Sequence, residues 1–431
     1  MEAQTHAEDP SYPDATGGPA RSTDERRHSS RLDIQVAGDC LGLVEHTFGS
    51  LPDESLIVIG LLDGFTGGHM RVDLPPALAD PFPSARLIAE CLAGEDSDPT
   101  PEAALVVMIS KTVPSAPQDA LWRACLDSLN LILESEYCVR IVQTWFISGG
   151  YIRDPQCSEA RCCDLPGQDV ALLQDRPSIP GLQPESPARR SLHEAAQLFL
   201  AQAPPADPEL VHRCQQAREQ QVGGPQSRSA HTRPPAHRRF QSQGQGAELL
   251  LKRWDTALEE LRKDAVSPSK DVLVDLLAQL RSGTGRDLLI PLATHGFDVA
   301  RVGVEGVHRG IRPSAEPVLD KRLADYAGSF LGETGRRPDW ERVDALERLL
   351  QQLVPYAQDS ERENLLCLMA WIEWARGRGT AAGSFVDLCL AEFPQNQFSQ
   401  LIERFMQLKG VCQWARVKRH SWSWSRRGGS N

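Results

Sequence analysis

The stretch from Leu51 to Pro75 most constrains how this chain can fold. The residues from Leu56 to Ile59 are all apolar, a pattern that predicts a strand covered on both faces. The next segment, Asp63 to Gly68, is rich in residues that tolerate positive φ, so it predicts a hairpin loop. Alternation from His69 to Leu74 predicts the returning strand. We therefore expect an antiparallel hairpin within a sheet that has cover on both sides.

Further strands and helices alternate after this hairpin. The apolar runs Ala103–Ile109 and Val139–Ile147 predict two more strands, and the helical spacing in Ser84–Leu92 and Gln118–Leu133 predicts helices. Alternating strands and helices are typical of an α/β domain, which we place at residues 32–222. Its sheet should be mixed, because the opening hairpin is antiparallel.

The C-terminal half has a helical pattern throughout. Apolar residues recur at helical spacing over residues 247–412, which predicts an all-helical second domain. The fold class is therefore α/β followed by all-helical, or α+β overall. One helix should begin at Trp340, with Asp339 as its N-cap residue.

One part of this second domain is similar to a tetratricopeptide-type unit. Between Leu365 and Leu408, the residues Gly377, Ala382, Cys389 and Pro394 fall at the small-residue and proline positions of that repeat. A stack of such units requires at least three. We therefore expect a single helical hairpin and not a solenoid.

Three segments differ from the rest in composition. Residues 1–31 contain almost no aliphatic side chains, which predicts a disordered tail. Residues 223–246 contain no Leu, Ile or Val and predict a flexible linker. Residues 413–431 form a basic tail in which Trp and Arg alternate. This tail could bind single-stranded nucleic acid through charge and stacking or lie at a membrane surface. The simpler alternatives are a frayed terminus or a segment that folds onto the acidic body of its own chain.

Charge and cysteine content indicate the class of protein. The net charge of −12 argues against a chain that coats nucleic acid with its whole surface. The longest apolar run, Leu56–Leu62, is far shorter than the ~20 residues of a membrane span. The chain has eleven cysteines, an odd number, and an N-terminus without the features of a secretory signal. We expect a cytoplasmic protein with reduced cysteines and no membrane span.

Motifs around the hairpin and near the C-terminus carry a resemblance to a known family. The matching residues are Gly49, Pro52, Ser55-Leu56, Gly60-Leu61, Arg71 to Pro75, Cys162-Cys163, Pro166-Gly167, Ala370-Trp371, Trp374, Arg376-Gly377, Ala391 to Pro394, Leu401-Ile402 and Trp414. In these residues the chain resembles domain-of-unknown-function family 4192, uncharacterised proteins of high-GC Gram-positive bacteria. The chain departs from the family pattern at Ala37, Ser50 and Asp164. The resemblance covers most of residues 32–415 and implies no activity.

Polar side chains flank the opening hairpin and could form a catalytic site. Asp53, Glu54 and Ser55 precede the first strand, and Arg71 and Asp73 lie on the second. Carboxylates and a cation at one sheet end could perform acid–base chemistry. The simpler interpretation is turn chemistry before the first strand and cross-strand pairing on the second.

A cysteine-rich loop is the candidate metal site. Cys157, Cys162 and Cys163 have the spacing C-x4-C-C, and thiolates are zinc ligands. A structural zinc site usually takes four ligands, and either Asp164 or His193 would have to complete this one. The alternative is that Cys162 or Cys163 packs as a small apolar side chain.

Two hypotheses for function remain open. No phosphate-binding loop, nucleophile elbow, zinc-protease motif or kinase signature is present, so the Gly64–Gly68 loop is interpreted as a hairpin. The first hypothesis is a non-enzymatic scaffold that binds a protein partner through its helical domain. The second is an enzyme of unrecognised type at the sheet end near Asp53, Ser55 and Arg71, assisted by thiols or zinc. Under the second hypothesis, these residues and the cysteine pair should line one pocket.

Overall fold

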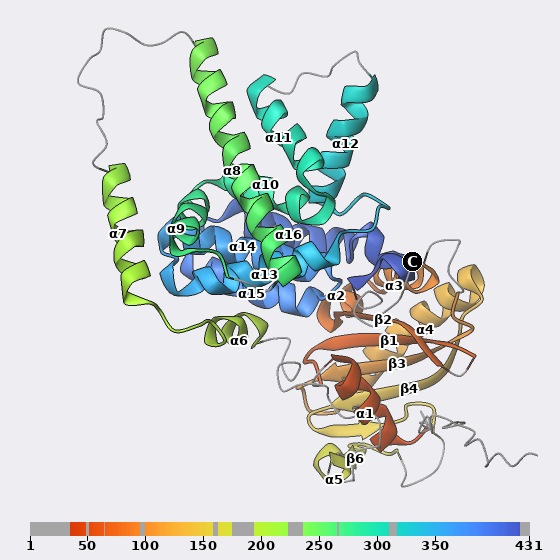
Figure 1. Ribbon diagram of the computed structural model, residues 1–431. Coiled ribbons are helices and arrows are strands. Elements are labelled where there is room, and N and C mark those ends of the chain that lie inside the picture. Colours follow the sequence, from red (N-terminus) through yellow and green to blue (C-terminus); the bar gives the residue numbers. More distant parts are fainter. Residues whose placement is uncertain are drawn as a thin grey trace, which may run out of the picture.

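The computed structural model has a sheet part (residues 35–174) and a helical part (residues 194–422), shown in Figure 1. The structure describes residues 35–48, 51–63, 65–94, 100–157, 163–174, 194–222, 236–264, 267–309 and 317–422. The predicted tail at 1–31 lies outside these residues. Among the helices within them, none combines the length and apolarity that crossing a membrane requires.

The described strands form one mixed sheet, as predicted. They are β1 (Ser55–Leu62), β2 (Phe65–Asp73), β3 (Ala103–Ser110), β4 (Arg140–Ser148), β5 (Tyr151–Arg153) and β6 (Gln168–Asp169). Their order across the sheet is β2-β1-β3-β4-β5-β6. Strands β3 and β4 are parallel, whereas the other neighbouring pairs are antiparallel.

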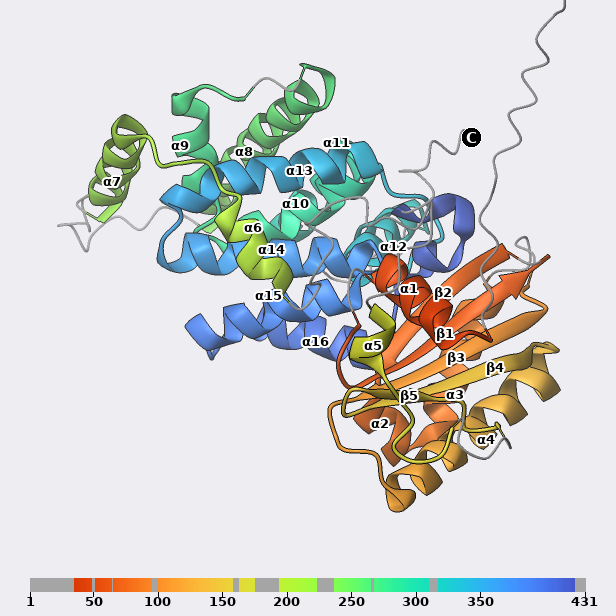
Figure 2. The same cartoon turned by 90° about the horizontal axis from the view of Figure 1, so that it is seen from below.

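Helices cover both faces of the sheet (Figure 2). One face carries α2 (Leu74–Ala79), α3 (Pro81–Ala93) and α4 (Ala116–Tyr137), and the other carries α1 (Ala37–Phe48) and α5 (Val170–Gln174). Leu56 and Val58 of β1 pack against the first set of helices, whereas Ile57 and Ile59 pack against α1 and α5. The run of apolar residues in β1 is explained by this cover on both faces.

The hairpin loop is shorter than the sequence predicts. Strand β2 begins at Phe65, so Gly67 and Gly68 lie within the strand. Close packing requires a glycine at Gly60 on β1, where a Cβ would lie 2.7 Å from Pro101 Cγ and 3.3 Å from the carbonyl oxygen of Gly68. A Cβ on Gly67 or Gly68 would have its nearest neighbour at 3.5 or 3.9 Å, which is ordinary contact. The pairing register shifts between Ile59 and Leu61 at this point.

Eleven α-helices form the described helical part. They are α6 (Ala195–Ala201), α7 (Pro208–Val222), α8 (Ala236–Asp264), α9 (Lys270–Gln279), α10 (Gly283–His295), α11 (Phe297–Arg309), α12 (Pro317–Leu331), α13 (Trp340–Leu353), α14 (Asp359–Ala375), α15 (Gly379–Glu392) and α16 (Gln397–Lys409). Helices α6 and α7 share a hydrophobic core with the later helices, although residues 195–222 were predicted with the sheet. The contact is direct, because the backbone N–H of Ala196 donates to Ser384 Oγ on α15 (3.0 Å).

Helix α8 corrects the predicted linker at 223–246. Residues 223–235 lie outside the described chain, but α8 already begins at Ala236. A polar sequence can continue an existing helix because propagation is much easier than nucleation. The amphipathic segment after Ala247, with Trp254 and Leu258 in the core, supplies that nucleus.

Helices α14 and α15 form the predicted hairpin. Gly377 joins them with a φ of +75°, a conformation that favours glycine. The helices approach closely at Cys367 and Cys389, whose Sγ atoms are 3.9 Å apart. Before this hairpin, the side chain of Asp339 accepts from the N–H of Arg342, so the predicted N-cap of α13 is confirmed.

The described part of the predicted basic tail packs against the helices. Trp414 is fully buried and donates from Nε1 to the carbonyl of Ala375 (2.8 Å). Trp422 donates from Nε1 to Asp344 Oδ1 (3.1 Å), and its ring lies 4.8 Å from the guanidinium carbon of Arg376. Residues 423–431 lie outside the described chain, so the nucleic-acid interpretation of the tail stays a prediction.

A buried guanidinium is central to this packing. The side chain of Arg376 is 1% exposed and pairs with Asp344 (2.6 Å), Glu347 (2.6 Å) and Glu373 (2.8 Å). Burial acts to lower the pKa of Arg376, but the three carboxylates raise it above its usual value. Loss of the guanidinium would leave the carboxylates without their cation, and loss of the carboxylates would leave a buried cation without a partner.

We expect Arg376→Ala to lower the free energy of unfolding by about 3 kcal/mol or more, because Glu373 would remain buried without its main partner. Arg378→Ala is the matched control: this arginine is 30% exposed and pairs with the same Glu373, so its loss should cost about 1 kcal/mol or less. Urea denaturation of the two variants measures the difference. Equal losses would contradict the role assigned to Arg376.

A half-buried histidine gives a second prediction. His295 Nδ1 lies 2.9 Å from Ser329 Oγ, and Nε2 lies 3.4 Å from the carbonyl of Arg336. Burial lowers the pKa of His295 to about 4. Between about pH 6.5 and about 4, the unfolded chain therefore binds a proton that the folded chain does not. The free energy of unfolding consequently decreases as the pH is lowered through this window. We expect His295→Gln to reduce this decrease in the free energy of unfolding, as measured by urea denaturation across the window. A decrease as large as in the native chain would contradict the assignment to His295.

Candidate functional site

The polar residues at the sheet end form one hydrogen-bonded network. Ser55 is fully buried; its hydroxyl donates to the carbonyl of Asp53 (2.6 Å) and accepts from Arg71 Nε (2.7 Å). The antiparallel register of β1 and β2 explains this, since Ser55 lies opposite Asp73 and Ile57 lies opposite Arg71. A nucleophilic serine needs a neighbouring base, and a guanidinium cannot accept its proton.

Arg71 connects this network to the helical part. Its Nη1 donates to Thr380 Oγ1 at the start of α15 (2.5 Å), and its Nη2 donates to Asp73 Oδ1 (3.0 Å). Burial lowers the pKa of Arg71, an effect that the carboxylates of Asp73 and Asp53 oppose. The guanidinium therefore acts as a cross-link between β1, β2 and α15.

The remaining carboxylates at the sheet end also have partners. Glu54 accepts from Ser110 Oγ (2.8 Å) and from the backbone N–H of Lys111 (2.9 Å), and it has a φ of +42°. Asp53 pairs with Lys111 Nζ (2.6 Å). These contacts match the structural interpretation of turn chemistry and cross-strand pairing.

The cysteines lie elsewhere. Cys157 and Cys163 line a cavity of about 510 Å³ beside the start of α1, together with Gln143 and Asp154. The backbone N–H of Asp154 donates to Cys163 Sγ (3.4 Å), and Gln143 Nε2 donates to Asp154 Oδ2 (3.0 Å). The lining of this cavity includes none of the residues Asp53, Ser55, Arg71 and Asp73, so the described candidates do not converge on one pocket.

Cys162 lies outside the described residues. Within the described ranges, no group of three or more His, Cys, Asp or Glu side chains is placed to hold a metal ion. A zinc site at Cys157, Cys162 and Cys163 therefore stays a prediction.

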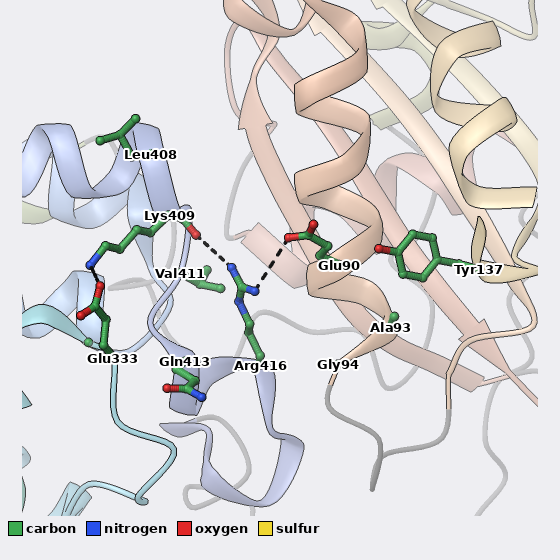
Figure 3. Close-up of a pocket in the computed structure, with 11 residues that line it drawn as sticks. Glu90, Ala93, Gly94, Tyr137, Glu333, Leu408, Lys409, Val411, Gln413 and Arg416 are labelled. Carbon is green, nitrogen blue, oxygen red and sulfur yellow. Dashed lines mark hydrogen bonds and ion pairs between the residues drawn. The ribbon is translucent and has the colours of Figure 1, made fainter. Parts of the chain in front are cut away.

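A cleft of about 540 Å³ lies between the sheet part and the helical part (Figure 3). Its lining comes from the end of α3, the end of α4, the turn after α12, the end of α16 and the segment that follows. The lining residues are Glu90, Ala93, Gly94, Tyr137, Gly332, Glu333, Leu408, Lys409, Val411, Gln413 and Arg416. Sequence reasoning missed this cleft; its one available signal was the basic character of residues 413–431.

The charged groups of the cleft are paired unequally. Lys409 Nζ contacts Glu333 Oε1 at 2.5 Å and the carbonyl of Leu331 at 3.3 Å, so this cation is well held. Arg416 Nη1 lies 4.0 Å from Glu90 Oε2, and its Nη2 donates to the carbonyl of Lys409 over 3.4 Å. The guanidinium of Arg416 lies between the two walls (Figure 3). The cleft therefore holds one tight ion pair and one loose one.

We expect Arg71→Ala to lower the free energy of unfolding by about 2 kcal/mol, because buried Ser55 loses a charge-assisted donor. Arg86→Ala should cost about 1 kcal/mol or less, since the Arg86–Glu136 pair is exposed at 58% and 40%. Urea denaturation compares the two variants. If Arg86→Ala lowered the free energy of unfolding as much as Arg71→Ala, Arg71 would not have the cross-linking role described above.

The family model for a domain of unknown function, DUF4192, matches residues 38–302 and 335–409. No curated protein and no solved structure matches the chain. The two matched segments span most of the sheet part and most of the helical part, which agrees with the motifs identified around β1, β2 and α14. The chain belongs to the DUF4192 family, whose function is unknown.

Proposed function

We propose that this protein is a non-enzymatic scaffold that binds a protein partner through helix α8 of its helical part. The observation that carries the proposal is a pair of exposed leucines, Leu249 and Leu250, at 54% and 39% exposure. They lie on a helix that projects from the body in Figure 1. Their neighbours Leu251 and Trp254 are buried in the helical core, so α8 itself is firmly anchored.

The charge of this segment favours an acidic partner. Lys252 and Arg253 follow the leucine pair on α8 and pair with Glu248 (3.0 Å) and Asp275, and because these ion pairs are exposed, carboxylates of a partner could replace them. A partner with an acidic surface around an apolar patch would complement both features.

The arrangement at the sheet end supports the same proposal. The Ser55 hydroxyl donates a hydrogen bond to a backbone carbonyl, and Arg71 and Asp53 contact the side chains of Thr380 and Lys111. The alternative, an enzyme with its site at Asp53, Ser55, Arg71 and Asp73, would require these structural contacts to break during each turnover. Protein binding through α8 leaves them intact.

The test captures partners from lysate of the native organism with the tagged full-length chain. We expect the variant Leu249→Asp/Leu250→Asp to lose a partner that the native chain retains, because two charges in the apolar patch oppose its burial. Leu172→Asp is the control, since Leu172 is 73% exposed on α5 of the sheet part. Quantitative mass spectrometry identifies the captured proteins, and the purified partner is then tested for direct, salt-sensitive binding.

Two results would overturn this proposal. One is a set of captured proteins that is the same for the native chain and the double variant. The other is a change in the chain's own mass on light scattering when the leucines are replaced, which would make the patch a contact between copies.

A further inference from the structure

We propose that the cleft between the sheet part and the helical part binds a small molecule through a carboxylate or phosphate group, with Arg416 as the anchoring cation. The site is separate from α8 and does not depend on the scaffold proposal. It uses residues from both parts of the fold.

The dimensions of the cleft fit a small molecule. Its volume of about 540 Å³ lies within the range of ~300–1,000 Å³ that is typical of ligand sites. One wall is built from Glu90, Ala93 and Tyr137 of the sheet part, and the facing wall from Lys409 and Val411 of the helical part. A ligand seated there would contact both parts at once.

Arg416 has hydrogen-bonding capacity to spare. A guanidinium carries five N–H donors. Within the described residues, Arg416 makes one hydrogen bond, to the carbonyl of Lys409 at 3.4 Å, and its pair with Glu90 is 4.0 Å long. Arg376, by contrast, contacts three carboxylates at 2.6–2.8 Å. An anionic group with two oxygens could form the bidentate pair that Arg416 lacks.

Other polar groups in the cleft suit an anion as well. Tyr137 places a phenolic hydroxyl, which can donate a hydrogen bond, on the lining, and burial, helped by the charges of Glu90 and Glu136, raises its pKa. The Gln413 side chain supplies an amide N–H₂ on the same lining.

Glu90 is the carboxylate beside Arg416 that opposes an anion, whereas the other carboxylate of the lining, Glu333, is neutralised by Lys409 (2.5 Å). The Glu90 side chain is 44% exposed, and its contact with Arg416 is too long for a hydrogen bond. A ligand carboxylate or phosphate would take its place beside the guanidinium. Removal of the Glu90 charge should therefore strengthen binding, and this sign distinguishes an anion from a ligand whose cation contacts Glu90.

The experiment is isothermal titration of the full-length chain with inorganic phosphate and, separately, with succinate, against sodium chloride at matched ionic strength. We expect saturable binding of phosphate, succinate or both. Arg416→Gln should weaken that binding about tenfold or more, because it removes the charge-assisted contacts. Arg419→Gln should leave it unchanged, since Arg419 is exposed and does not line the cleft. Glu90→Gln should tighten it severalfold.

Several outcomes would overturn the proposal. They are no binding of either probe up to about 20 mM, which would reveal even a millimolar Kd; equal binding by the native chain and Arg416→Gln; an equal loss in Arg419→Gln; and weaker binding by Glu90→Gln. If circular dichroism shows that Arg416→Gln is not folded, Tyr137→Phe replaces it. That variant removes one hydroxyl, and unchanged affinity in it would then count against the site.

Discussion

The guanidinium of Arg71 holds the end of the opening hairpin against the helical part, and the surrounding polar residues are arranged to satisfy it. Burying a cation is costly unless its donors find partners. Ser55, Asp73 and Thr380 are those partners, and they come from β1, β2 and α15. Residues that look like catalytic candidates in the sequence therefore serve as the joint between two halves of the fold.

The segment after α16 forms the second joint. Gly410, with a φ of +66°, packs where a side chain would meet Leu87 and Met70 of the sheet part. Trp414 then fills the helical core, and Arg416 turns back toward Glu90. The cleft is the space left beside this crossing. Close packing at Gly410 fixes the two walls of the cleft relative to each other, and the long Arg416–Glu90 ion pair also connects them.

Local patterns in the sequence predicted much of the fold. The apolar runs of β1 and β3 identified buried strands, and the cap at Asp339 identified the start of α13. Other features depend on tertiary packing: Gly303 lowers helix propensity within α11, but in the fold it makes room for the ring of Tyr326 on α12. Such a requirement becomes visible once the neighbouring helix is in place.

The sites were harder to predict, for a similar reason. Hairpin pairing alone brings Arg71 close to Ser55, so that cluster could be anticipated from the sequence. Thr380 could not, and neither could the cleft, because Glu90, Tyr137, Glu333 and Arg416 come from separate segments whose approach depends on tertiary packing. Cys157 and Cys163 line the cavity beside α1 and not the hairpin end, a placement that also depends on tertiary packing.

The contact between Arg71 and Thr380 spans 309 residues of chain, which has a consequence for folding during synthesis. At ~5–20 residues per second, a ribosome needs about 15–60 s to make the residues between them. Throughout that time the sheet can assemble, but the guanidinium of Arg71 lacks its partner on α15. Until α15 is made, water must take the place of Thr380 as the hydrogen-bond partner of Arg71. Polar residues around Arg71, such as Asp53, Asp73 and Lys111, help to keep this edge of the nascent sheet soluble.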